Sequence, residues 1–234
     1  MIRLNKYLSQ QGLASRRQAD TLISQGKVLV NDQPAKLGTT VDPDKDTVKF
    51  LGKVVVSNKP ELETYLVYKP LGYVSTTSDP QGRPTVTSLV KSSTRLYPIG
   101  RLDQDSEGLI LLTNDGDLGF KLTHPKHQIP KTYHALVTGN VTPTKLNRLR
   151  RGVMLKDGRT APAQIEVIRP QGNKSLLSIT IFEGRNRQIR RMFSTQKLEV
   201  EKLKRVAIGE LELGDLKPGD SKKLDTKDLS SLLH

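Results

Sequence analysis

The sequence predicts an α+β protein, in which a small α/β N-terminal domain precedes a larger domain with a mostly antiparallel mixed sheet flanked by helices. Two observations carry this prediction. Residues 1–52 contain short helical and strand patterns that form a unit of their own, and a stretch with Asn58-Lys59-Pro60 separates them from the remainder. The remainder has many strand-length apolar segments, which lack the regular alternation with long helices that a doubly wound parallel sheet needs. We therefore expect domains at 1–52 and 63–234, joined by a linker at 53–62.

Two short helices open the N-terminal domain. Leu4, Tyr7 and Leu8 recur at helical spacing. Ser15 stands where an N-cap belongs, and Gly26 ends the second helix, whose apolar face is formed by Ala19, Leu22 and Ile23. Strands and turns follow, with strands at Lys27–Val30, Val41 and Val48–Phe50 and turns at Asn31-Asp32 and Asp42-Pro43-Asp44.

The larger domain contains six further strand patterns and three helical ones. The expected strands are Tyr65–Tyr68, Leu109–Thr113, Thr132–Val137, Gln164–Ile168, Leu176–Phe182 and Lys202–Ile208. The expected helices are Leu118–Thr123, Pro143–Arg151 and Arg187–Thr195. Thr142 is an N-cap type, and Pro143 suits the first helical position that follows it. The tail at 220–234 is polar and partly helical.

Composition and charge restrict the classes of function. The 234 residues carry a formal net charge of +14, which indicates a polyanionic partner, nucleic acid first. The chain has no cysteine, so we expect no disulfides and no cysteine nucleophile. It has only four dispersed histidines, so we expect no zinc site. No apolar run is long enough to span a membrane, and the N-terminus lacks the pattern of a secretory signal. We expect a cytoplasmic protein with no membrane partner.

Three segments of the larger domain carry residues suited to chemistry. Gly100–Gly116 places Asp103 and Asp105 in a loop before an apolar strand, and Lys131-Thr132-Tyr133 opens another strand. Glu183–Phe193 contains four arginines, of which Arg187, Arg190 and Arg191 are spaced to share one helical face.

Spacing alone leaves several interpretations of these segments open. Asp103 and Asp105 could hold a divalent cation beside a phosphate, or form a glycosidase-like carboxylate pair. Asp103 could instead make a salt bridge with an arginine or brace a turn. Tyr133 could be an ordinary core residue, and the basic runs could be a solvated face.

The N-terminal pattern resembles the S4 RNA-binding domain. The resemblance is carried by Arg3-Leu4-Asn5-Lys6-Tyr7-Leu8, Ser15-Arg16-Arg17-Gln18-Ala19 and Gly26-Lys27-Val28-Leu29-Val30-Asn31. A helix N-terminus has free N–H groups and a positive dipole, so arginines placed there favour phosphate binding. The resemblance implies that this domain grips folded RNA through Arg3, Lys6, Arg16, Arg17 and Lys27.

The three chemical segments, taken in order behind that domain, resemble the pseudouridine synthase family that modifies small- and large-subunit ribosomal RNA. The motifs are G-R-L-D-x-D-S-x-G-L, K-x-Y and E-G-R-N-R-Q-I-R-R-M, and the resemblance runs from Arg3 to about Leu224. It implies that Asp103 is the catalytic nucleophile, that Tyr133 packs on the target uracil, and that Arg190 pairs with Asp103. It further implies that Arg101 fills the space left by a flipped base, with additional RNA contacts from Lys131, Arg185, Asn186 and Arg187.

The reaction implied by the family detaches uracil from its ribose, turns it, and reattaches it through C5. It requires no redox change and no group donor, so we expect no cofactor and no metal. A carboxylate suits the nucleophile, and a nearby guanidinium favours its ionised form. The wording of Arg185–Arg190 is closer to the large-subunit branch, and a monomer is expected. In one departure, Ser194–Glu199 lacks the glycine common before the next strand.

Two alternatives come from other classes of protein. A non-catalytic S4-type rRNA-binding or ribosome-assembly protein would keep the fold without needing a carboxylate among phosphates. A metal-dependent nuclease would shorten RNA instead of isomerising it. The first would leave RNA unmodified and the second would cleave it, whereas a pseudouridine synthase modifies RNA and keeps its length.

Overall fold

The computed structural model describes residues 1–56 and 61–232. The chain divides into two compact units. The first comprises Met1–Leu62 with the short stretches Ser93–Arg95 and Asn114–Gly116, and the second comprises Glu63–Ser92, Leu96–Thr113 and the chain from Asp117 onward. Residues 57–60 of the expected linker lie outside the described residues.

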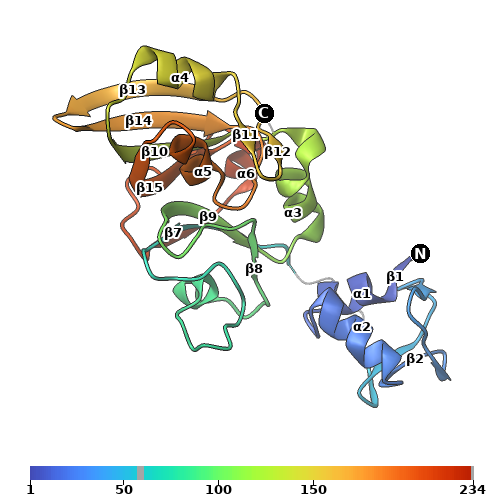
Figure 1. Ribbon diagram of the computed structural model, residues 1–234. Helices are drawn as coiled ribbons and strands as arrows, with labels where there is room; N and C mark the ends of the chain where they lie inside the picture. The colour runs from blue at the N-terminus through green and yellow to red at the C-terminus, as the bar shows by residue number, and fades with distance from the viewer. Residues whose placement is uncertain (57–60, 233–234) are drawn as a thin grey trace. The chain divides into compact units, whose positions relative to one another are not determined.

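The first unit packs two helices against short strands (Figure 1). Helix α1 spans Leu4–Gln10 and α2 spans Arg16–Ser24. The Ser15 side chain accepts a hydrogen bond from the Gln18 N–H at 3.2 Å, which confirms the expected N-cap. The strands are β1 (Ile2–Arg3), β2 (Val28–Val30), β3 (Gln33–Pro34), β4 (Thr40–Val41), β5 (Val48–Phe50) and β6 (Lys53–Val54).

The first unit's sheet is antiparallel, in the order β3-β2-β5-β6, and β1 pairs separately with β4. The β2–β3 turn places Asn31 and Asp32 at φ 50° and 63°, a conformation that short polar side chains tolerate. Strand β6 occupies positions assigned to the linker, because Val55 continues the ladder with a hydrogen bond from its N–H to the Val48 carbonyl.

The second unit is built on one large sheet (Figure 1), whose main path runs β13-β14-β10-β15-β9-β7-β17. Strand β8 adds to β9, and β16 adds to β15. All of these pairings are antiparallel except that of β9 with β15. The strands are β7 (Thr64–Lys69), β8 (Tyr97–Ile99), β9 (Glu107–Thr113), β10 (Lys131–Thr138), β13 (Gln164–Gln171), β14 (Lys174–Ile181), β15 (Glu199–Ile208), β16 (Leu211–Glu212) and β17 (Ser221–Lys223). The expected α+β class with a mostly antiparallel mixed sheet is confirmed.

Helices cover both faces of this sheet. They are α3 (Gly116–Thr123), α4 (Pro143–Arg150), α5 (Gln188–Ser194) and α6 (Thr226–Ser231), with short 3₁₀ turns at η1 (Val86–Leu89) and η2 (Pro125–His127) and a small hairpin of β11 (Met154–Leu155) and β12 (Gly158–Arg159). Apolar residues of α4 and α5 share one buried cluster, and those of α3 share the other with the region of α6. The Thr142 N-cap of α4 is confirmed by a hydrogen bond from the Lys145 N–H.

Strand β9 is buried on both faces of the sheet. Ile110 and Leu112 join the cluster under α4 and α5, whereas Leu109 and Leu111 join the cluster under α3 and α6. Successive side chains of a strand point to opposite faces, so a continuous apolar run is what a doubly covered strand requires. This run anchors the loop that precedes it, which carries Asp103.

The β9–β15 pairing joins the two halves of the sheet. Its register aligns Glu107 with Lys204 and Gly108 with Arg205. Gly108 has φ 103°, and a Cβ on it would overlap the backbone of Arg205. Glycine is therefore required for the two strands to approach at this point.

The start of α5 and the loop before β15 both depend on residues with left-handed backbone conformations. Helix α5 begins at Gln188, because Arg187 adopts a left-handed conformation with φ 46°, so Arg187 does not share a helical face with Arg190 and Arg191. In the loop that lacks the expected glycine, Lys197 takes φ 55° and supplies the left-handed residue. No helix in the described part of the chain is both long and apolar enough to cross a bilayer.

Candidate active site

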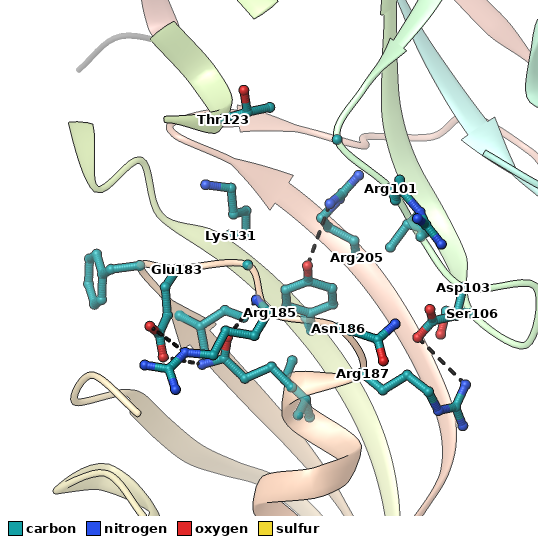
Figure 2. A pocket seen from close by; sticks show the side chains of 18 of the residues that line it. Arg101, Asp103, Ser106, Thr123, Lys131, Glu183, Arg185, Asn186, Arg187 and Arg205 are labelled. Carbon is teal, nitrogen blue, oxygen red and sulfur yellow. Dashed lines mark hydrogen bonds and ion pairs between the residues drawn. The ribbon is translucent and has the colours of Figure 1, made fainter. Parts of the chain in front are cut away.

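The second unit contains a cavity of about 370 Å³ beside the Asp103 loop. Asp103 and Ser106 come from the loop on one side, and Glu183, Arg185 and Asn186 come from the segment on the other (Figure 2). Seven of the residues singled out from the sequence line it: Arg101, Asp103, Lys131, Tyr133, Arg185, Asn186 and Arg187. Arg190 is not among the lining residues, and Arg3, Lys6, Arg16, Arg17 and Lys27 belong to the other unit.

The Asp103 loop is held by hydrogen bonds on both flanks. The Ser75 hydroxyl donates to the Leu102 carbonyl at 2.8 Å and accepts from the Leu102 N–H at 3.0 Å. The Asp103 carbonyl accepts from the Ser106 N–H at 3.1 Å, which closes a turn. The fully buried Lys69 donates to the Ser106 carbonyl at 2.6 Å. These contacts fix the backbone that carries the carboxylate.

The sequence-based pairing of Asp103 with Arg190 is wrong. The Asp103 carboxylate forms an ion pair with Arg187, whose Nη1 lies 3.6 Å from Oδ2. Arg190 instead donates from Nη2 to the backbone carbonyl of Asp105 at 2.8 Å, and from Nη1 to the carbonyl of Val200. Arg187 is the left-handed residue that precedes α5, and its side chain reaches the loop that carries Asp103 and Asp105.

Asp105 braces the same loop. Arg187 donates two hydrogen bonds of 3.0 Å to its two carboxylate oxygens, and Arg190 lies 3.4 Å from Oδ2. Burial opposes ionisation of Asp105, but the hydrogen bonds from Arg187 and the charges of both arginines outweigh it and lower its pKa. The proposed cation site of two carboxylates is therefore occupied by guanidinium groups. No cluster of three or more His, Cys, Asp or Glu suited to a metal occurs among the described residues.

Tyr133 lies at the cavity wall opposite Arg205 on the neighbouring strand. The two residues are register partners of β10 and β15, so their side chains share a face of the sheet. Arg205 Nη1 lies 3.5 Å from the Tyr133 hydroxyl, and its guanidinium carbon lies 6.0 Å from the ring centre. Tyr133 is only 8% exposed, because it packs in the core cluster while it also lines the cavity.

Sequence reasoning missed Arg205, which lines the cavity and is 4% exposed. Its Nε donates to the Leu109 carbonyl at 2.6 Å, and its Nη2 has no hydrogen-bond partner among the described residues. The hydroxyl of Ser106, also on the cavity wall, is likewise unsatisfied. A signal existed, because strand alternation places Arg205 on the same buried face as Leu203.

Burial lowers the pKa values of two lysines in the second unit. Burial lowers the pKa of Lys69 to about 8, although Asp103, Asp105 and Glu107 act in the opposite direction. Burial and the charge of Arg205 lower the pKa of Lys131 to about 8. The Lys131 ammonium donates to the Ile129 carbonyl at 2.8 Å. In both cases removal from water disfavours the charged ammonium.

Arg185 is used within the protein, which differs from the RNA contact implied by the resemblance. Its Nε donates to Glu183 at 3.1 Å, and its Nη atoms donate to the carbonyls of Asp157, Gly158 and Arg159. The contacts tie the Glu183–Arg187 segment to the β11–β12 hairpin. Asn186 and Arg187 are exposed and remain at the cavity edge.

Comparison with known proteins identifies the catalytic unit. Residues 63–195 match the family model described as RNA pseudouridylate synthase. The chain belongs to this family. Residues 2–48 match the S4 domain, so the order of the two modules is the one that the sequence motifs indicated.

Similar proteins extend over nearly the whole of this RNA pseudouridine synthase. A Bacillus subtilis protein named ribosomal large subunit pseudouridine synthase B is 46% identical over 209 residues, 88% of this chain and 84% of the relative. An Aquifex aeolicus protein named uncharacterized RNA pseudouridine synthase is 42% identical over 89% of this chain and 84% of the relative. A crystal structure described as a pseudouridylate synthase covers 99% of this chain and 100% of its own, with a TM-score of 0.72 and 28% identity. The enzyme is therefore an RNA-modifying isomerase, and the non-catalytic alternative is set aside.

Proposed function

We propose that this enzyme converts one uridine of large-subunit ribosomal RNA to pseudouridine, with Asp103 as the nucleophile. Relatives from Bacillus subtilis and Vibrio cholerae, at 46% and 37% identity, are named ribosomal large subunit pseudouridine synthase B. The net charge of +14 suits a polyanionic substrate. The S4 module and the basic cavity edge both fit RNA.

One observation carries the assignment of the nucleophile. The Asp103 side chain is 25% exposed, paired with a guanidinium, and on the wall of a cavity that Tyr133 and Arg205 also line. A carboxylate in such a place is shielded enough to react with a bound sugar and charged enough to be nucleophilic. Asp105 faces two arginines and is committed to bracing the loop.

The chemistry follows from these positions. The bond between N1 and C1′ breaks, and its electron pair leaves with the uracil. Asp103 either bonds to C1′ or stabilises the positive charge that develops there. The uracil turns against the flat face of Tyr133, C5 bonds to C1′, C5 loses its proton, and N1 gains one. The atoms of substrate and product are the same, so no group donor is consumed.

The surrounding cations have separate tasks in this proposal. Arg187 lies beside Asp103 and favours its ionised form. Arg190 positions the loop through the Asp105 carbonyl and does not touch the reacting carboxylate. Arg101, exposed at the cavity edge, occupies the space that the everted nucleotide leaves, which offsets part of the cost of unstacking.

The N-terminal unit supplies affinity for RNA in the same proposal. Arg16 and Arg17 are exposed in the first turn of α2, where free N–H groups and the helix dipole favour phosphate. Lys27 is exposed after the same helix, and Arg3 donates to the Gly38 carbonyl at 2.7 Å. Lys6 completes the set. Phosphate contacts of this kind position an RNA without reading its sequence.

The test compares variants of the two loop carboxylates. Pseudouridines are mapped in large-subunit rRNA transcripts after incubation with wild-type enzyme, Asp103→Ala, Asp103→Asn or Asp105→Asn. We expect both Asp103 variants to form no product while they retain RNA affinity. Asp105→Asn should be slower yet active, because it weakens a brace and leaves the nucleophile in place.

Asp157→Asn provides a matched control. Asp157 pairs with Arg191 of α5 by two hydrogen bonds of 2.8 and 2.9 Å, so this variant also removes a carboxylate–arginine pair, away from Asp103. It should retain nearly full activity. Normal turnover by Asp103→Ala would remove the nucleophile from the proposal, and unmodified rRNA after treatment with wild-type enzyme would remove the substrate.

A further inference from the structure

A cluster of exposed rings lies next to the catalytic cavity. Phe120 of α3 is 51% exposed, and its ring centre lies 4.7 Å from that of His124 and 6.2 Å from that of His127. The two imidazoles lie 6.3 Å apart. The ammonium of Lys126 lies 5.5 Å from the centre of the Phe120 ring. We call Phe120, His124, Lys126 and His127 the ring cluster.

The ring cluster is not needed to pack α3. Leu118 and Leu122 are the buried residues of that helix, and they contact the core on the opposite side from Phe120. His124 is fixed in place, because its Nδ1 accepts a hydrogen bond from the Lys126 N–H at 3.3 Å at the start of η2. The arrangement is thus a fixed aromatic surface in a position where a charged or polar side chain would fit the fold equally well.

The position of the ring cluster relates it to the substrate. Thr123, His124, Pro125 and Gln128 line the same cavity as Asp103 and Tyr133. Figure 2 shows Thr123 near Lys131 at the side of this cavity. An RNA strand whose uridine enters the cavity must carry its neighbouring nucleotides across the rim. Everting that uridine also leaves a neighbouring base without its stacking partner.

The chemistry of the ring cluster suits a nucleobase with its phosphate. The chain from Leu118 to Lys131 contains no acidic residue, whereas Lys121 and Lys126 are exposed. Burial, followed by the charges of Lys126, His124 and Lys121, lowers the pKa of His127, which favours a neutral ring at neutral pH. Aromatic faces flanked by cations are the usual platform for unpaired nucleotides.

We propose that the ring cluster is a stacking platform for an unpaired nucleotide adjacent to the target uridine, with Phe120 as its main face. This inference rests on the proposed function, because it assumes an RNA strand entering the cavity at Asp103. It adds a determinant of substrate recognition that lies outside the reacting residues.

The test uses an rRNA fragment in which the wild-type enzyme forms pseudouridine. Phe120→Ala should raise KM and the dissociation constant about 5- to 150-fold, the range of a lost base–aromatic stack, with kcat little changed. Phe120→Trp should retain affinity, because it keeps an aromatic face. Ile168→Ala is the matched control, since Ile168 is 47% exposed on β13 and does not line the cavity.

Abasic substitution locates the nucleotide. Each position flanking the target uridine is made abasic in turn, and affinity is measured for wild type and Phe120→Ala. At one position the abasic RNA should weaken wild type to the level of the variant and leave the variant unaffected. Equal affinities of wild type and Phe120→Ala, or additive losses at every position, would overturn the proposal. If wild type forms no pseudouridine in any rRNA transcript, the proposed function fails. If wild type modifies a transcript but binds it no more tightly than Phe120→Ala does, only the stacking platform fails.

Discussion

Replacing Gly108 by alanine should destabilise the junction of β9 and β15 by more than backbone strain alone would. A Cβ at position 108 would overlap the Arg205 carbonyl oxygen and lie 2.7 Å from the Arg205 nitrogen. The positive φ of 103° costs a non-glycine residue roughly 1–2 kcal/mol. Overpacking against backbone costs roughly 1–3 kcal/mol more, so the free energy of unfolding should fall by roughly 2–5 kcal/mol. Urea unfolding followed by circular dichroism measures this loss.

Gly172→Ala separates the two contributions. Gly172 has φ 63°, and a Cβ on it would meet nothing within 4 Å, so this variant introduces backbone strain without a steric clash. It should lose only roughly 1–2 kcal/mol and keep its activity. Gly108→Ala should also lose activity in conditions where it remains folded, because the junction sets the Asp103 loop against Arg205. Equal losses of stability in the two variants would refute the reasoning.

Three further predictions concern charge. Burial depresses the pKa of Lys69 from 10.5 to about 8, so between these pH values the unfolded chain binds more protons than the folded one. The free energy of unfolding of wild type, relative to that of Lys69→Met, should therefore rise by about 1.4 kcal/mol per pH unit from pH 8 to 10. A difference that does not change with pH in urea titrations would contradict this. Arg205→Met should slow single-turnover product formation about 3- to 10-fold, the value of one hydrogen bond, and add little to the loss already caused by Tyr133→Phe; fully additive losses would show that the two residues act separately. Reversing the charge of Arg16 and Arg17 to glutamate should weaken rRNA affinity and make its dependence on salt shallower by about 1.5–2 in log–log slope, and an unchanged slope would remove the RNA role of α2.

Much of the fold could be predicted from local patterns. The apolar run of Leu109–Leu112 indicated a strand, which the structure covers on both faces, and the caps at Ser15 and Thr142 located two helix starts. These features depend on nearest neighbours in the chain, where propensity and hydrogen bonding act directly. Motif order behind an S4-like module then indicated the family, which the match over residues 63–195 supports.

The partners of individual charges could not be predicted in the same way. Arg187 and Arg190 both suit a carboxylate, and only the left-handed backbone at Arg187 decides which of them lies beside Asp103. Nothing in the side chain of arginine signals that conformation. Lys69 and Arg205 were missed because their partners are distant in sequence: Ser106 is 37 residues from Lys69, and Leu109 is 96 residues from Arg205.

The single parallel pairing in an otherwise antiparallel sheet also bears on how the enzyme matures. β9 can pair with β7 soon after synthesis, because these two antiparallel strands are close in the chain. It can pair with β15 only later, because β15 is synthesised much further along the chain. Until then a nascent chain has its carboxylate loop without Arg205, and the S4 module is already complete. Such a chain lacks the part of the cavity wall that β15 supplies, so the cavity is complete only when the last third of the polypeptide has closed the seam.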